Sequence, residues 1–129
     1  MRTIHFCRDD VEYPILFDPE VAEQIQKEYG SLSECIDKVA AFDFGATAWL
    51  LHLLIQEGIL YQNDLTGTHQ KPPTQAAVRR LLTHPDLRDP QFITAIVDSF
   101  KDFMGGNVSG QQLAAAGLEM LLQSLKTSR

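Results

Sequence analysis

The sequence has few of the residues that mark specialised classes of protein. Its 129 residues include only two cysteines, Cys7 and Cys35, which is too few for the disulfide framework of a small secreted domain. The 11 basic side chains are outnumbered by 17 acidic ones, which argues against a protein that binds nucleic-acid phosphates. The longest apolar stretch, Ala46–Ile55, contains Thr47 and His52 and is too short to cross a bilayer.

What the sequence does contain is the composition of an ordinary folded domain. Hydrophobic residues make up 44% of the chain and charged residues 22%, which excludes wholesale disorder. A chain of 129 residues predicts one domain, 1–129, that folds without a metal or a disulfide. Arg8, Asp9 and Asp10 stand where a signal peptide would have its apolar core. We therefore expect a cytoplasmic protein without a membrane segment.

The negative charge is concentrated in the first half of the chain. Residues 1–61 carry four basic and eleven acidic side chains, a formal charge of −7. Residues 62–129 carry seven basic and six acidic side chains, a formal charge of +1. A partner of the first half would therefore present a basic surface to it. The alternative is that the acidic side chains serve only solubility.

The N-terminal residues predict a β-hairpin. In Thr3–Cys7 the side chains alternate, with Ile4 and Phe6 on one face. Val11–Phe17 alternates in the same way, and the acidic residues around position 10 suit a turn better than a cation site. Pro14 lacks a donor for the hydrogen-bond ladder, so we expect the second strand to lie at an edge.

The remainder of the first half predicts three helices. Asp18 and Ser31 have the side chains that cap helix N-termini, and each precedes a run with apolar residues at helical spacing. The third helix runs from Phe44 to Glu57, and Gly58 is expected to stop it. This helix is apolar nearly all round, which is typical of a central core helix or of one that lies between subunits.

The second half predicts a loop and three further helices. Residues 62–73 are rich in loop-forming side chains, and the helices of 74–129 open at Thr74, Asp89 and Ser109. The predicted fold class is therefore mainly α: a helical bundle of about six helices with a short N-terminal β-hairpin. The expected core consists of apolar residues on the inward stripes: Ile25, Ile36, Trp49, Leu50, Leu53, Leu54, Phe92, Ile96 and Phe100.

The sequence contains no convincing catalytic or metal-binding pattern. A zinc site would need His5 and Cys7 together with Cys35 and His52, but packing and surface roles account for these residues more simply. A nucleophilic pair of Cys35 and His52 would need a third, orienting group that the sequence does not identify. The glycine-rich run 105–110 follows a helix and has no lysine, so it is not a phosphate loop. We expect no cofactor and no enzymatic activity.

Four short motifs in the first half of the chain form a recognisable pattern. Tyr13–Asp18 reads YPILFD and leads into a helix, Tyr29–Glu34 reads YGSLSE, and Trp49–Leu51 and Glu57–Gly58 follow. Over about residues 11–60 this pattern resembles the small tail assembly chaperones of long-tailed bacteriophages and prophages. Members of that family often begin with a short β segment, an FD that enters a helix, and a YGSLxE turn between helices.

This resemblance implies a viral, non-enzymatic helper of tail assembly that acts in the bacterial cytoplasm. Such a chaperone coats the helical tape measure protein while tail tube subunits polymerise, so the tape measure protein would be its main partner and the tail tube protein a second. The apolar third helix and the hairpin edge also predict self-association, with neither nucleic acid nor membrane as a partner. The alternative function is a virion structural component or another phage-encoded protein–protein adaptor.

The predicted partner-binding residues lie on the first three helices. An amphipathic partner helix docks through spaced apolar anchors, and an acidic rim suits a basic partner. We therefore expect an apolar groove bordered by these helices, with contacts at Tyr29, Trp49, Leu53 and Gln56 and rim charges at Glu20, Glu23 and Glu28.

Overall fold

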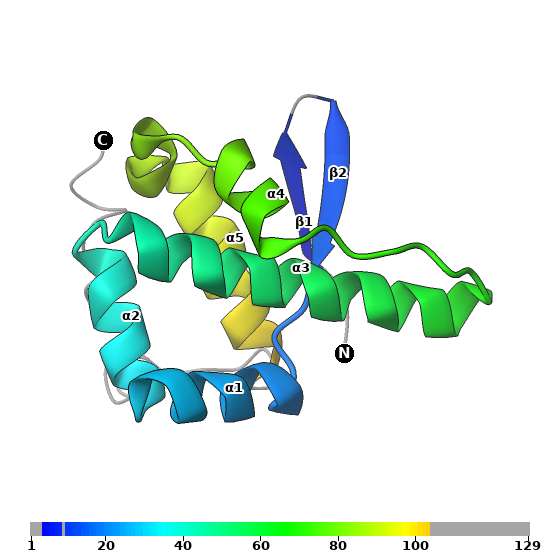
Figure 1. Ribbon diagram of the computed structural model, residues 1–129, viewed down its shortest axis with the longest axis horizontal. Helices are drawn as coiled ribbons and strands as arrows, with labels where there is room; N and C mark the ends of the chain where they lie inside the picture. The colour runs from blue at the N-terminus through cyan, green and yellow to red at the C-terminus, as the bar shows by residue number, and fades with distance from the viewer. Residues whose placement is uncertain (1–3, 9, 104–129) are drawn as a thin grey trace.

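The protein is mainly helical with a two-stranded antiparallel sheet at its N-terminus, as the sequence predicts. The computed structural model describes residues 4–8 and 10–103. Figure 1 shows the long helix α3 running across the molecule, with α2 joining it to α1 at one end and the hairpin packed against its middle. The elements are β1 (Ile4–Arg8), β2 (Val11–Ile15), α1 (Pro19–Tyr29), α2 (Leu32–Ala40), α3 (Phe44–Thr66), α4 (Gln75–Leu81), the 3-10 helix η1 (His84–Arg88) and α5 (Pro90–Phe103).

The hairpin is a tight pair of strands that packs on two helices. Phe6 pairs with Tyr13 in the antiparallel register, and the turn places Asp10 at a φ of 65°. Asp tolerates this left-handed backbone better than most residues. The ring of Phe6 meets Phe92 of α5 edge to face, with 5.4 Å between centroids. After β2, the Leu16 N–H donates to a carbonyl of α3, which ties the chain to that helix.

The predicted caps of the first two helices are confirmed. The Asp18 carboxylate accepts the Val21 N–H at 2.9 Å, and the Ser31 hydroxyl accepts the Glu34 N–H at 3.1 Å. Gly30 ends α1 with a φ of 89°, a conformation that any side chain would strain. Local side-chain chemistry alone therefore positions the turn between α1 and α2.

The prediction that Gly58 stops the third helix is wrong. Helix α3 continues through Gly58 to Thr66, and Gly67 caps it in the left-handed conformation at a φ of 70°. Gly58 serves close packing instead, because a Cβ at this position would collide with the carbonyl of Pro14. The predicted loop 62–73 therefore begins later, after Thr66, and the extra turns of α3 extend the helix past the hairpin.

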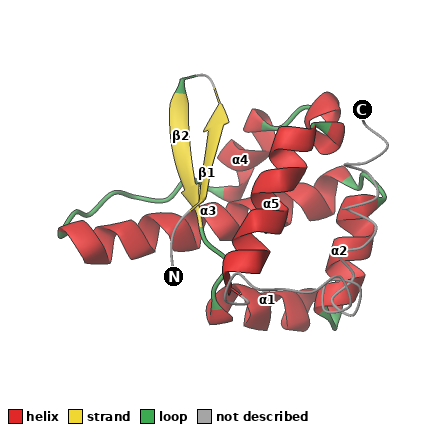
Figure 2. Cartoon of the chain, turned by 180° about the vertical axis from the view of Figure 1, so that it is seen from behind, coloured by secondary structure: helices red, strands yellow, loops and turns green. Residues whose placement is uncertain are grey.

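The second half matches the prediction in part. Helices α4 and α5 form after Thr74 and Asp89, as expected, but the segment between them folds into the 3-10 helix η1, which the sequence did not predict. The buried Asp86 carboxylate organises this turn by accepting the Thr83 N–H at 2.7 Å. Figure 2 views the molecule from the opposite side to Figure 1 and shows α5 crossing the face that is nearer to the viewer. The helix predicted from Ser109 lies outside the described residues.

The core matches the expected one except at Trp49, which is half-buried and packs at its margin. The other eight expected residues are buried. The sequence did not identify Phe17, which is 2% exposed and packs against Phe100 edge to face at 5.4 Å. Other fully buried side chains that were not predicted are Ile15, Leu51, Ile55, Ile59 and Ile93.

Candidate functional site

The three predicted rim charges lie on the exposed side of α1. Glu20, Glu23 and Glu28 are all exposed, at positions that share one broad side of the helix. Glu23 forms an ion pair with Lys27, with 3.2 Å between Nζ and Oε1, so its charge is partly offset. Glu20 accepts a hydrogen bond from the Gln24 amide at 2.9 Å. Glu20 and Glu28 therefore contribute most of the negative charge that this side of α1 offers.

The predicted aromatic contacts lie together, whereas the predicted aliphatic contact is buried. Tyr29 and Trp49 meet edge to face with 5.2 Å between centroids and 79° between ring planes. Leu53 is only 8% exposed and belongs to the core, while Gln56, one turn further along α3, is half-buried. We call Tyr29 and Trp49, together with the rim residues Glu20, Glu23 and Glu28, the acidic α1 surface.

A pair of carboxyl groups joins the start of α1 to the middle of α3. Burial, followed by the hydrogen bond to Asp18 and the charge of Asp18, raises the pKa of Glu57 from 4.5 to about 7. A hydrogen bond from Gln56 acts in the opposite sense, and the charge of Glu20 adds a smaller upward contribution. The Asp18 carboxylate, which interacts with Glu57, also caps α1.

The cysteines and the histidine that a zinc site or nucleophile would use have other roles. Cys7 is exposed and its thiol lies 3.7 Å from a Glu12 carboxylate oxygen, whereas Cys35 is buried, and both thiols are free. Burial raises the pKa of Cys35 to about 12, so it stays a neutral thiol near pH 7. The His52 ring bonds to the backbone of Pro73, and burial lowers its pKa. The described part of the chain holds no cluster of three or more metal-ligating side chains.

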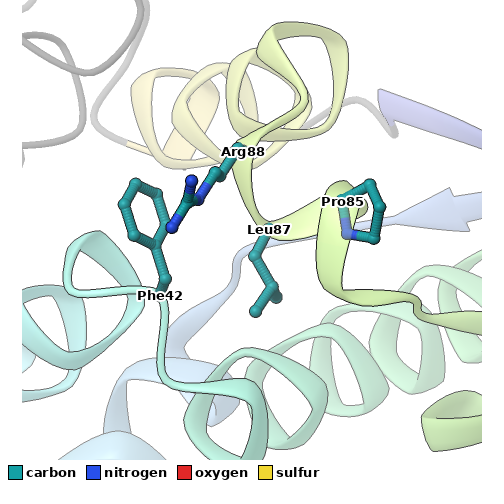
Figure 3. Close-up of a pocket in the computed structure, with 4 residues that line it drawn as sticks. All are labelled: Phe42, Pro85, Leu87 and Arg88. Carbon is teal, nitrogen blue, oxygen red and sulfur yellow. The ribbon is translucent and has the colours of Figure 1, made fainter.

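An apolar pocket that the sequence did not predict lies where α2 turns into α3. It measures about 500 Å³ and is lined by Phe42, Pro85, Leu87 and Arg88. Figure 3 shows the Arg88 side chain reaching toward the Phe42 ring while Leu87 points down between them and Pro85. The Arg88 guanidinium carbon lies 4.8 Å from the Phe42 centroid, a cation–π distance. We call these four residues the arginine–phenylalanine pocket.

Phe42 occupies a backbone position that favours glycine. Its φ is 63°, in the left-handed region, which costs an L-residue about 1–2 kcal/mol. The Phe42 N–H bonds to the Val39 carbonyl and the Asp43 N–H to the Lys38 carbonyl, each at 3.0 Å, which is the Schellman ending of a helix. The sequence feature that could have revealed this position is an aromatic residue between the end of one helix and the cap Asp43 of the next, where glycine is usual.

A second arginine covers the neighbouring aromatic ring. Arg79 of α4 lies 5.3 Å from the centroid of Phe44, the first residue of α3. The adjacent Arg80 is exposed. The junction between α2 and α3 therefore has two aromatic rings under guanidinium groups, one from α4 and one from η1.

The comparisons with known proteins gave no match: no protein family, no curated protein and no solved structure resembles the chain significantly. Among residues 4–8 and 10–103, none of the helices combines the length and the apolar character that crossing a bilayer requires.

Proposed function

We propose that the protein is a non-enzymatic tail assembly chaperone of a long-tailed phage or prophage, which binds the tape measure protein during tail assembly. The observation that carries this proposal is the motif series from Tyr13–Asp18 through Tyr29–Glu34 to Glu57–Gly58. These motifs have coherent structural roles, since Asp18 and Ser31 cap the first two helices. Because caps mark where helices begin, two proteins with the same spacing of caps are expected to arrange their helices in a similar way.

The acidic α1 surface supplies the physical part of the proposal. Trp49 is half-buried against Tyr29, so its ring is held in a fixed orientation while part of it remains available to a partner. Aromatic side chains held in this way are frequent anchors of protein interfaces. The exposed Glu20 and Glu28 would attract basic side chains of an approaching helix. Leu53, four residues after Trp49 on α3, belongs to the core cluster against which Trp49 packs.

We also propose that the protein self-associates, and a few exposed apolar side chains support this rather than the whole of α3. Most apolar residues of α3 are buried within the fold, so this helix is not itself a broad subunit interface. Beyond the hairpin, however, Leu60 and Leu65 are exposed, Leu65 to 69%, and Val11 is exposed on the hairpin. A second copy that covered these side chains would remove apolar surface from water. Light scattering that finds only monomers at high micromolar concentration would contradict this part of the proposal.

Co-expression with the tape measure protein encoded nearby tests the main proposal. We expect the tape measure protein to be soluble with the wild-type chain and insoluble without it. The variant Trp49→Ala should lower the soluble fraction, while Arg80→Gln, an exposed side chain away from α1, serves as the matched control. Equal solubility with and without the chain would contradict the chaperone function. Retention of the chain in finished particles would favour a virion component instead.

A further inference from the structure

The arginine–phenylalanine pocket differs in charge from the acidic α1 surface, because its lining contains Arg88 and no carboxylate among the described residues. We propose that it binds an acidic protein segment, in which a large aliphatic side chain enters the pocket and a neighbouring carboxylate pairs with Arg88. This inference is independent of the tape measure protein and of the acidic α1 surface. It rests on the volume and lining of the pocket, on the stacking of the Arg88 guanidinium on Phe42, and on the left-handed backbone conformation of Phe42.

The lining of the pocket suits an aliphatic side chain. Leu87 is buried and forms the floor, while Pro85 and Phe42 form apolar walls, and Phe42 is 36% exposed. The volume of about 500 Å³ lies within the range of small-ligand sites and exceeds what one leucine or methionine needs. An aliphatic side chain that enters would exclude water from the exposed part of the Phe42 ring.

Arg88 supplies the preference for a carboxylate. Its guanidinium is stacked on Phe42 at 4.8 Å, which fixes the plane of the group while its N–H edges remain free to donate. Within the described residues, no carboxylate forms an ion pair with Arg88. The acids beside the pocket accept backbone hydrogen bonds instead: Asp86 accepts the Thr83 N–H at 2.7 Å, Asp89 the Gln91 N–H at 2.9 Å, and Asp43 the Ala46 N–H at 2.9 Å.

A protein segment fits this surface better than a nucleic acid does. Arg88 already covers the face of Phe42, so this ring does not offer a free platform on which a base could stack. A phosphate backbone also carries charge along its whole length and would meet the excess of acidic side chains elsewhere on the molecule, whereas the proposed segment needs a carboxylate only beside Arg88. Phe42 keeps its aromatic side chain at a strained position where glycine would fit, which is typical of a functional site.

Two blocked helical peptides with the same leucine spacing provide the test, one with glutamates beside the leucines and the other with lysines. Binding is measured by titration calorimetry, and the contact residues are mapped by NMR on the ¹⁵N-labelled protein. We expect the glutamate peptide to bind at least tenfold more tightly and to shift the amide signals of Phe42, Leu87 and Arg88. Arg88→Gln should weaken binding about tenfold, as the loss of a charged hydrogen bond does.

Arg80→Gln is the matched control, because it makes the same charge change at an exposed arginine outside the pocket lining. It should change the affinity less than twofold, and circular dichroism should show that both variants are folded. Equal binding of the lysine peptide, equal effects of the two variants, or no binding of either peptide at millimolar concentration would overturn the proposal. An oligothymidylate that displaces the glutamate peptide would assign the surface to nucleic acid instead.

Discussion

The acidic α1 surface and the arginine–phenylalanine pocket use aromatic rings in different ways. Trp49 is held by another ring, Tyr29, and stands beside carboxylates, whereas Phe42 is held under a guanidinium on a strained backbone. We propose the first arrangement as a site for a basic partner and the second as a site for an acidic one. One helix, α3, carries Trp49 and begins just after Phe42. The comparison therefore suggests a small protein that distinguishes two partners by charge.

The largest expected effect comes from the close packing of α3, the helix that carries Trp49, against the hairpin. Gly58→Ala would drive a Cβ into the Pro14 carbonyl, and backbone on both sides leaves little room for adjustment. We expect a loss of about 3 kcal/mol in the free energy of unfolding, measured by urea denaturation. Gly45→Ala on the same helix is the control, because its Cβ would lie 3.5 Å from the nearest side-chain atom, an ordinary contact. Equal losses in the two variants would contradict the packing role of Gly58.

The caps were predictable and Gly58 was not, for a physical reason. Asp18 and Ser31 act on N–H groups three residues away, so the sequence itself contains the whole interaction. Gly58 looks like a helix stop, but its role depends on Pro14, 44 positions earlier in the chain, pressing against it. Contacts between residues so far apart in the chain cannot be recognised from the pattern of neighbouring residues.

The two surfaces differ in the same way: residues of the acidic α1 surface were named from the sequence, and the arginine–phenylalanine pocket was not. Tyr29 and Trp49 were predicted as partner contacts because an amphipathic helix docks through spaced apolar anchors, and the structure brings their rings together. The arginine–phenylalanine pocket was missed, because Arg88 belongs to the unpredicted η1 and meets Phe42 only in the folded chain. Leu53 was predicted as both core and contact, and its burial favours the first role.

The second prediction compares the coupling energy between Trp49 and Tyr29 with that between Phe42 and Arg88. Trp49→Ala should cost about 2 kcal/mol of stability, since the side chain is half-buried. A double-mutant cycle with Tyr29→Ala should give a coupling of about 1 kcal/mol. The same cycle for Phe42 and Arg88 should give about 0.5 kcal/mol, as expected for an exposed cation–π pair. Couplings in the reverse order would contradict the description of the two surfaces.

The third effect isolates the strain at Phe42. Phe42→Gly and Phe42→Ala both remove the ring and its contact with Arg88, but only glycine adopts a φ of 63° without strain. We expect the glycine variant to be more stable than the alanine variant by about 1.5 kcal/mol in thermal or urea unfolding. Identical stabilities would mean that the left-handed backbone at this position is not a constraint.

The smallest effect concerns the carboxyl pair beneath the acidic α1 surface. Between pH 4.5 and about 7 the folded chain holds a proton on Glu57 that the unfolded chain releases, so stability falls as the pH rises through this range. Solvent screening of this partly exposed group limits the effect to about 1 kcal/mol. Glu57→Gln should therefore stabilise the protein at pH 8 and not at pH 4. The measurement is unfolding at the two pH values.

The most direct test of the chaperone function measures how fast the chain associates with a helical tape measure fragment at several ionic strengths. We predict that Glu20→Lys with Glu28→Lys slows association and flattens its salt dependence, because these charges steer a basic partner. Arg79→Glu with Arg88→Glu should leave the rate unchanged or raise it. Equal effects of the two double variants, or a rate that does not respond to either, would contradict the assignment of the tape measure protein to the acidic α1 surface.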